Sequence, residues 1–217
     1  MRIDTIRGAI RLLGLVLPMT LLASSAQGQA VGIAVNTKTV NQKSAYVVLP
    51  AGEAMASDQD QGVSVPGLVT AQDLFAIVTG DADATDGSTA VSSATLGVVN
   101  LLNGLITADG VVAIASSSIG DDGVSSNAAG SSLANLVVGG VEVSDPAPNT
   151  RMTLPGVGYV LLNEQRPSGD GVTTSGMTVN MIHVVLQEPV LGLLGQITGY
   201  RTVGNIVVGS ATSSVTR

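Results

Sequence analysis

The sequence has no cysteine and no tryptophan, and it contains only one histidine, one phenylalanine and three tyrosines. Without cysteine the chain forms no disulfide and carries no lipid on a cysteine. A lone histidine offers no second ligand of the type that transition metals prefer, and no GxSxG motif marks a nucleophilic serine. Few aromatic rings are present to stack on sugars or bases. These absences disfavour an enzyme, and a secreted hydrolase is the third of three functions considered.

Basic residues are also scarce, with 9 Lys and Arg against 16 Asp and Glu in 217 residues. The basic residues are spread along the chain and form no cluster. Nucleic acids and anionic membrane surfaces are bound by clustered Lys and Arg. The sequence therefore predicts no nucleic-acid partner.

The first thirty residues have the three parts of a secretory signal peptide. Arg2, Arg7 and Arg11 precede an uncharged run over residues 12–23, and small and polar residues follow over residues 24–30. The apolar run is shorter than the roughly 20 residues that a membrane-spanning helix needs, so no retained transmembrane helix is predicted. We expect cleavage after Ala26, Gly28 or Ala30, and a secreted, extracellular or cell-surface protein, with the periplasm as the alternative.

Removal of residues 1–30 makes the chain more acidic. Loss of Arg2, Arg7, Arg11 and Asp4 from the 9 basic and 16 acidic residues leaves 6 and 15, which is a net charge of −9. The tail over residues 209–217 has no hydrophobic span and no basic cluster, so no sorting signal is expected there. How the mature protein is attached to a surface, if it is attached, stays open.

The composition favours strands over helices. Gly 27, abundant Val, Ala, Ser and Thr, and 12% charged residues are typical of many short β-strands, and a mean hydropathy of +0.44 argues against disorder. About 190 mature residues can bury one core. We predict a single all-β domain over residues 31–217, most simply a β-sandwich of two mostly antiparallel sheets, with a β-solenoid as the alternative.

Several strands can be placed from apolar runs and turn residues. The best-specified one covers residues 159–162, after two prolines and Gly156 and Gly158, and ends at Asn163 and Glu164. Residues 177–186 give the longest strand, ended by Glu188-Pro189. Further strands are predicted at 31–35, 46–49 and 206–209, and residues 68–78 favour a strand over a helix. Residues 51–66 read as a surface loop, and Asp109-Gly110 as a two-residue hairpin turn.

His183 lies among apolar residues of the predicted 177–186 strand. Alternation places His183 on one face with Val179, Met181 and Val185. A general base or metal ligand is the functional interpretation. A buried structural histidine, bonded to the backbone or to a polar neighbour, is the one we expect.

Asp81, Asp83 and Asp86 are the one candidate metal site, because closely spaced carboxylates can surround calcium. The spacing differs from that of a helix-loop-helix calcium loop, since one extra residue precedes the third Asp and no Glu follows. An ordinary solvated turn is therefore the expected structure, and no cofactor is predicted unless calcium binds there. The GDDG segment at residues 120–123 is predicted to be a plain turn.

The C-terminal half resembles a known family. Pro148-Asn149-Thr150, residues 154–158 (LPGVG), 162–165 (LNEQ), 178–184 (TVNMIHV) and 206–211 (IVVGSA) follow one another in the order typical of the choice-of-anchor P family of secreted bacterial proteins. The resemblance covers about residues 96–213. It implies an exported, cell-surface or extracellular domain whose relatives carry interchangeable sorting signals, and it implies no catalytic activity.

The sequence thus predicts an exported, non-enzymatic surface, matrix or adhesive protein. The alternative is a secreted module that binds calcium or a glycan. Val- and Gly-rich strands with few Lys or Arg at their edges pair readily with other chains, so self-association or binding to surface and matrix components is the expected mode of action.

Overall fold

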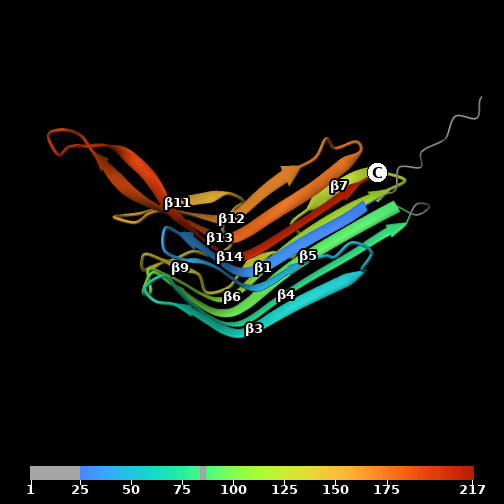
Figure 1. Cartoon of the computed structure of the whole chain (residues 1–217), viewed down its shortest axis with the longest axis horizontal. Helices are drawn as coiled ribbons and strands as arrows, with labels where there is room; N and C mark the ends of the chain where they lie inside the picture. Colours follow the sequence, from blue (N-terminus) through green and yellow to red (C-terminus); the bar gives the residue numbers. More distant parts are fainter. Residues whose placement is uncertain (1–24, 84–86) are drawn as a thin grey trace, which may run out of the picture.

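The structure, a computed structural model, describes residues 25–83 and 87–217 and is a β-sandwich of two large antiparallel sheets. All strand pairs in both sheets are antiparallel, which confirms the predicted sandwich in place of a solenoid. Figure 1 shows the two sheets side by side, with one long hairpin projecting beyond them. No helix in the described residues is long and apolar enough to cross a membrane.

One sheet, which we call sheet A, has six strands and contains both ends of the described chain. Its order across the sheet is β11 (Thr150–Leu154), β12 (Gly158–Ser168), β13 (Thr174–Leu191), β14 (Ile197–Thr216), β1 (Ser25–Thr37) and β2 (Asn41–Val48). β1 and β14 lie next to each other, with Ser25 opposite Thr216.

The other sheet, sheet B, has eight strands. Its main order is β10 (Val141–Glu142), β9 (Val137–Val138), β6 (Ile106–Gly120), β5 (Gly87–Leu101), β4 (Val69–Asp83) and β3 (Met55–Val65). β7 (Gly123–Asn127) and β8 (Ser132–Leu133) also pair with β6.

The core fills the space between the sheets and consists almost wholly of aliphatic side chains. Small residues such as Ala94, Ala113 and Ala115 let the sheets approach closely where they are fully buried. Serine hydroxyls also cross the gap: Ser92 donates to the Thr212 carbonyl at 2.6 Å, and the Ser117 and Ser213 hydroxyls lie 2.7 Å apart. These bonds satisfy polar groups that burial would otherwise penalise.

Both sheets bend along one line that crosses nine strands. At this line the pairing skips one or more residues on each strand, and every second strand carries a residue with positive φ. In sheet A these residues are Asn163, Gly209 and Ala45, and in sheet B they are Gly110 and Asp73. We call this feature the bulge line. Figure 1 shows the resulting bend in both sheets.

The bulge line reverses which residues face the core. In β13, Val179 and Met181 lie in the core, but so do Ile182 and Val184. In β5 the same reversal separates Leu96 from Val99. At this line the two paired strands skip equal numbers of residues, so their register is the same on both sides, but the alternation of side chains changes and simple period-two counting fails on the far side.

This reversal corrects the predicted face of His183. Beyond the bulge line His183 lies on the outer face of sheet A with Asn180, while Val179 and Met181 point inward. The predicted grouping with Val179 and Met181 was therefore wrong. The histidine is also 14% exposed and not fully buried.

Asp109-Gly110 is not a hairpin turn, and this prediction was wrong. β6 continues through these two residues, and Gly110 has a positive φ of 103° at the bulge line. The turn between β5 and β6 lies at residues 102–105, where Asn103 has φ 57° and Gly104 has φ 89°. Asn-Gly is itself a hairpin signal.

Two predicted strand ends and one predicted loop were also wrong. β12 continues through Asn163 and Glu164 to Ser168, and β13 continues through Pro189 to Leu191. Residues 51–66, predicted to be a loop, contain the edge strand β3. The longest strand is β14, with 20 residues, which exceeds the 18 of β13. The predicted turn at GDDG and the strand over residues 68–78 are confirmed.

The start of β1 overlaps the predicted signal peptide. Residues 25–30 are paired with β14, and Gln29 and Ala30 also pair with β2, although the sequence places this stretch before the mature domain. Most of the predicted signal peptide lies outside the described residues. Its cleavage stays a prediction.

Candidate functional site

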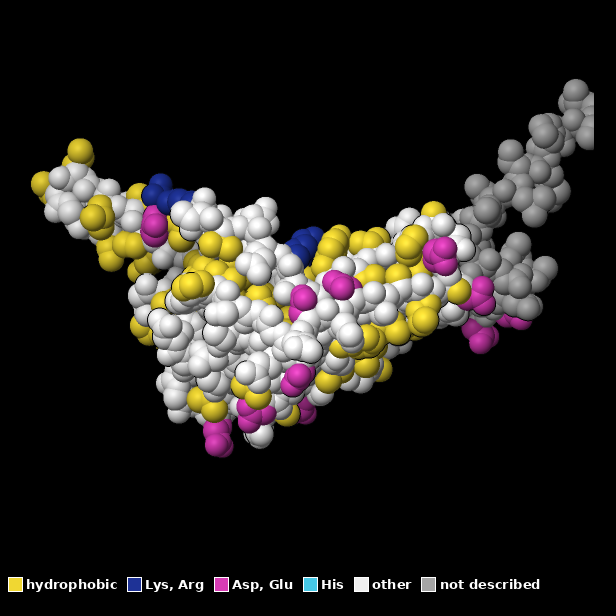
Figure 2. All heavy atoms as spheres, turned by 60° about the horizontal axis from the view of Figure 1, so that its bottom comes forward, with side chains coloured by type: hydrophobic (Ala, Val, Ile, Leu, Met, Phe, Trp, Pro, Cys, Tyr) yellow, Lys and Arg dark blue, Asp and Glu magenta, His cyan; other side chains and the backbone are white. Residues whose placement is uncertain are grey.

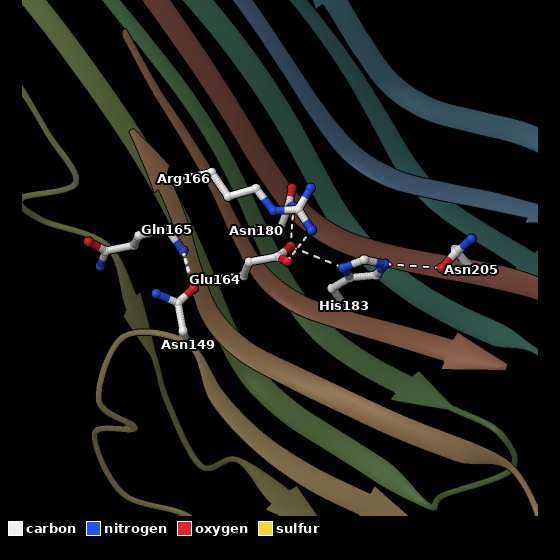
Figure 3. Close-up of polar contacts among 7 residues, drawn as sticks. All are labelled: Asn149, Glu164, Gln165, Arg166, Asn180, His183 and Asn205. Atoms are coloured by element: carbon white, nitrogen blue, oxygen red, sulfur yellow. Dashed lines mark hydrogen bonds and ion pairs between the residues drawn. The ribbon is translucent and has the colours of Figure 1, made fainter. Parts of the chain in front are cut away.

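The polar groups of the sandwich converge in a cluster at the bulge line on the outer face of sheet A, which we call the Glu164 cluster (Figure 3). It contains Glu164 and Arg166 from β12, Asn180 and His183 from β13, and Asn205 from β14. The positive φ of 50° at Asn163 turns the next residue, Glu164, toward this face.

Glu164 is the centre of the cluster and is 3% exposed. The Asn180 Nδ2 amide donates to Oε2 at 2.6 Å, His183 Nδ1 lies 3.0 Å from the same atom, and Arg166 donates to Oε1. Burial is the largest influence on the pKa of Glu164 and raises it, but the bonds from Asn180, His183 and Arg166 and the charge of His183 together lower the pKa below its ordinary value. Glu164 is thus held as a carboxylate.

His183 bridges two acceptors, because its Nε2 lies 3.1 Å from Asn205 Oδ1 while Nδ1 faces Glu164. The protonated ring has two N–H donors and satisfies both. Its partners are a carboxylate, which also accepts from Asn180 and Arg166, and an amide. Both ring nitrogens are engaged, so the arrangement suits a structural bridge between three strands better than a general base.

The sequence predicted no metal centre at these residues, and the only candidate ligands that it offered were Asp81, Asp83 and Asp86. Among residues 25–83 and 87–217 no group of three or more His, Asp or Glu is placed to hold a metal ion. Asp81 lies exposed at the end of β4. Asp86 and the side chain of Asp83 lie outside the described part, so the calcium site stays a prediction.

A second feature is the projecting hairpin, which we call the arm. It comprises residues 188–201, the ends of β13 and β14 and the turn between them. Leu193 and Leu194 at its tip are 105% and 92% exposed, and Val190, Leu191, Ile197 and Tyr200 are exposed along its strands. Residues 189–200 contain no charged side chain. Figure 2 shows these apolar side chains standing clear of the sandwich.

The base of the arm carries charge. Glu188 accepts from Arg201 at 2.9 Å, and Lys38 Nζ lies 3.6 Å from the same carboxylate. Hydrogen bonding from Arg201, followed by the charges of Lys38 and Arg201, lowers the pKa of Glu188. Two cations share one carboxylate, so this region is net positive.

The β2 edge of sheet A and the β3 edge of sheet B are joined by side-chain hydrogen bonds. Asp58 and Asp60 of β3 accept hydrogen bonds from the Tyr46 and Ala45 backbone N–H groups of β2, each at 2.8 Å, and Ser44 donates to Asp60 at 2.7 Å. The bond from Ser44 and then that from Ala45 lower the pKa of Asp60. Ala45 has a positive φ of 48°, and the backbone N–H groups of Ala45 and Tyr46 both point toward the carboxylates of β3. Association through this edge is therefore blocked.

A third feature is a cavity of about 750 Å³ at the end of the sandwich, which we call the end cavity. It lies between the start of β1, the end of β2 with its following loop, and the ends of β4 and β14. Its apolar lining residues are Ala26, Val48, Leu49, Pro50, Ala51 and Ala54, and its carboxylates are Glu53 and Asp81.

Sequence reasoning found His183 but missed its partners. Glu164 was predicted to end a strand, and Asn180 and Asn205 carried no signal of their own. The charge-free, aliphatic run over residues 189–200 was visible in the sequence and could have marked the arm. Comparisons of the chain with protein families, curated proteins and solved structures found no match, so its relationship to the choice-of-anchor P family stays a prediction.

Proposed function

We propose that the protein is an exported, non-enzymatic surface or matrix component that acts by association through its arm. The observation that carries this proposal is the exposure of Leu193 and Leu194 at the tip of a projecting, charge-free hairpin. A two-stranded hairpin is marginally stable alone in water, and large exposed apolar surfaces mark contact sites. The composition that disfavours an enzyme supports the same proposal.

The Glu164 cluster supports a non-enzymatic role because its groups bond to one another. Glu164 and both ring nitrogens of His183 have partners within the protein. A catalytic pair would need a nucleophile or substrate within hydrogen-bond reach of the base. We assign the cluster to stability at the bend of sheet A.

The alternative, a calcium- or glycan-binding module, would use the end cavity. Its carboxylates Glu53 and Asp81 offer oxygen ligands, and its volume is in the range of small-ligand sites. Titration with calcium or with simple sugars, followed by calorimetry, tests this alternative. Saturable binding by a protein that does not associate with surfaces would replace the arm-based proposal.

The test of the proposed function is where the protein is found when its arm is altered. A culture expressing the protein is separated into cells, extracellular matrix and medium. We expect the native protein in the surface and matrix fractions, and a variant with Leu193→Asp and Leu194→Asp in the medium. The matched control is Val172→Asp, which changes an exposed residue in a turn of the sandwich. Equal retention of all three proteins would contradict the proposal.

A further inference from the structure

We propose that the arm of one copy docks into the end cavity of a second copy, so that the protein assembles head to tail. This inference rests on the proposed function and names its partner as another copy of the same chain. It depends on four observations: the positions of arm and cavity, the chemistry of the tip, the lining of the cavity, and the charges around each.

The arm and the cavity lie at opposite ends of the same strands. The arm is where β13 and β14 are joined, with Leu191 opposite Ile197. The cavity is at the other end of β14, where Thr212 and Ser214 line it and Ser25 of β1 lies opposite Thr216. Figure 1 shows the arm at one end of the molecule and the C-terminus at the other. An arm therefore cannot reach the cavity of its own chain.

The tip is apolar on both faces of the hairpin. Leu191 and Ile197 are paired and exposed, and Val190, one residue along, is exposed on the opposite face. Leu193 and Leu194 extend from the turn. A flat surface would cover one face, whereas a cavity can enclose the tip. Burial of each leucine side chain is favourable by about 1.5–3 kcal/mol.

The end cavity offers a lining that fits such a tip. Val48, Leu49 and Pro50 provide apolar walls, and the volume of about 750 Å³ is in the range that accommodates drug-sized apolar groups. The walls formed by the loop after β2 and by β14 are independent of where a signal peptide is cut.

The charges around the two features are complementary. Glu53 and Asp81 line the cavity, and three further acids, Asp121, Asp122 and Asp170, lie in turns at the same end of the sheets. At the base of the arm, Lys38 and Arg201 share the one carboxylate of Glu188. Figure 2 shows Lys and Arg side chains at the arm and near the middle of the molecule, and Asp and Glu side chains along the whole face, including the end away from the arm. Opposite charges orient an encounter between copies.

Such a contact joins two different surfaces and leaves a free arm and a free cavity at the ends of each assembly. Heterologous contacts of this kind close into rings or extend as filaments. An open-ended chain of copies is a simple way for one exported domain to form a matrix.

The absence of cysteine makes a direct test possible, since introduced cysteines are the only thiols. One chain carries Leu194→Cys, and a second chain, distinguished by mass, carries Ala51→Cys in the cavity wall. Under mild oxidation we expect a mixed disulfide between residues 194 and 51. A chain with Val172→Cys, at the same end as the cavity but outside its lining, replaces the Ala51→Cys chain in the control and should not cross-link to residue 194.

A mixing experiment tests direction. An arm variant, Leu193→Asp with Leu194→Asp, keeps its cavity, and a cavity variant, Ala51→Arg with Ala54→Arg, keeps its arm. In sedimentation velocity each variant alone should be monomeric, and their mixture should form a dimer and nothing larger. Circular dichroism and melting confirm that both variants are folded. Self-association of the cavity variant alone, or failure of the two variants to pair, would overturn head-to-tail docking.

The native protein and the arm variant also distinguish failure of head-to-tail docking from failure of the proposed function. If the native protein stays monomeric but floats with phosphatidylcholine vesicles in an arm-dependent way, the arm binds lipid and head-to-tail docking is wrong, while association through the arm stands. If the arm variant instead keeps native surface retention, the proposed function itself fails.

Discussion

Glu164 shows how one backbone residue can place a carboxylate in a position that sequence patterns do not reveal. Asn163, in the left-handed region, turns Glu164 to the outer face, where Asn180, His183 and Arg166 converge on it. Burial alone would favour its neutral form, and the surrounding donors reverse that preference. Glu164 therefore links β12 to β13 in this way only while it is ionised.

Replacement of Glu164 by Gln should lower the free energy of unfolding by about 1–3 kcal/mol at neutral pH, because the amide loses the ionic acceptor that three donors share. The pKa of Glu164 is lowered in the folded state from 4.5. Its stabilising effect is thus full above pH 4.5 and is lost as the pH falls below that value. Urea unfolding of both proteins between pH 3 and 7 measures this difference.

The matched control for that experiment is Glu188→Gln, which removes an exposed carboxylate at the base of the arm. Exposed ion pairs contribute little to stability, so this variant should unfold like the native protein. A difference between native protein and Glu164→Gln that does not shrink in acid would contradict the assigned role of Glu164.

Replacement of His183 by Ala should also destabilise the fold, by about 1–3 kcal/mol, because it removes one of the three groups bonded to Glu164 and the ring nitrogen that lies against Asn205 Oδ1. The double variant with Glu164→Gln should lose less than the two single losses combined, since the residues are in contact. Denaturant unfolding of all four proteins gives the coupling energy. Strict additivity would show that the 3.0 Å contact between the two side chains contributes nothing.

At the scale of strands, apolar runs in the sequence located the main elements, because buried strands need consecutive or alternating aliphatic residues. β1, β2, β4, β12, β13 and β14 were each found at least in part. β3 was missed because its sequence, MASDQDQGVSV, is polar as befits an edge strand whose Asp58 and Asp60 bond to β2. Strand ends were misplaced because β13 continues past Pro189, which lies opposite Tyr200, and β12 continues past Asn163, which the pairing with β13 skips.

The bulge line could not be predicted, because its residues carry other meanings in a single sequence. Gly110 after Asp109 is typical of a hairpin turn, and Gly209 in IVVGSA reads as the end of a strand. What distinguishes them is the alignment of five positive-φ residues across neighbouring strands, which depends on register. The predicted face of His183 was wrong for the same reason.

Gly209 and Gly110 allow a test of how the two sheets meet at the bulge line. Both have positive φ, but a Cβ at residue 209 would lie 2.7 Å from Val111 Cγ1 in the opposite sheet, whereas one at residue 110 would lie 3.5 Å from Ala134. Alanine in the left-handed region costs about 1–2 kcal/mol at either site. Thermal unfolding should show a larger loss for Gly209→Ala than for Gly110→Ala. Equal losses would mean that the sheets adjust freely.

The pairing of β1 bears on signal cleavage. Residues 25–30 pair with β14, so removal of this stretch would leave the end of β14 without its neighbour. Of the three expected positions, cleavage after Ala26 keeps the most pairs. Intact mass of the exported protein should therefore show a chain that begins at Gln27. A chain that begins at Val31 would mean that the sheet forms without those pairs, and an exported chain that begins at Met1 would contradict the signal peptide.

At the scale of the whole molecule, net charge and local contacts act in opposite directions. The full chain has a net charge of −7, so copies repel one another, while the arm and the acidic end favour contact. With one histidine in the sequence, few groups titrate between pH 8 and 5.5. Most carboxylates titrate below that range. Hydrogen bonds from the Thr173 side chain and from the backbone of residues 172–174 lower the pKa of Asp170, so this carboxylate stays ionised further into acid than an ordinary aspartate.

Association should therefore change little from pH 8 to 5.5 and strengthen from pH 5.5 toward the isoelectric point of about 4.4, as the repulsion disappears. The average mass in sedimentation velocity should rise smoothly with protein concentration, because head-to-tail growth has no fixed stoichiometry. The arm variant with Leu193→Asp and Leu194→Asp should stay monomeric at each pH where it is folded. If the arm variant associates as strongly as the native protein near pH 4.4, the contact is a general loss of solubility and does not depend on the arm.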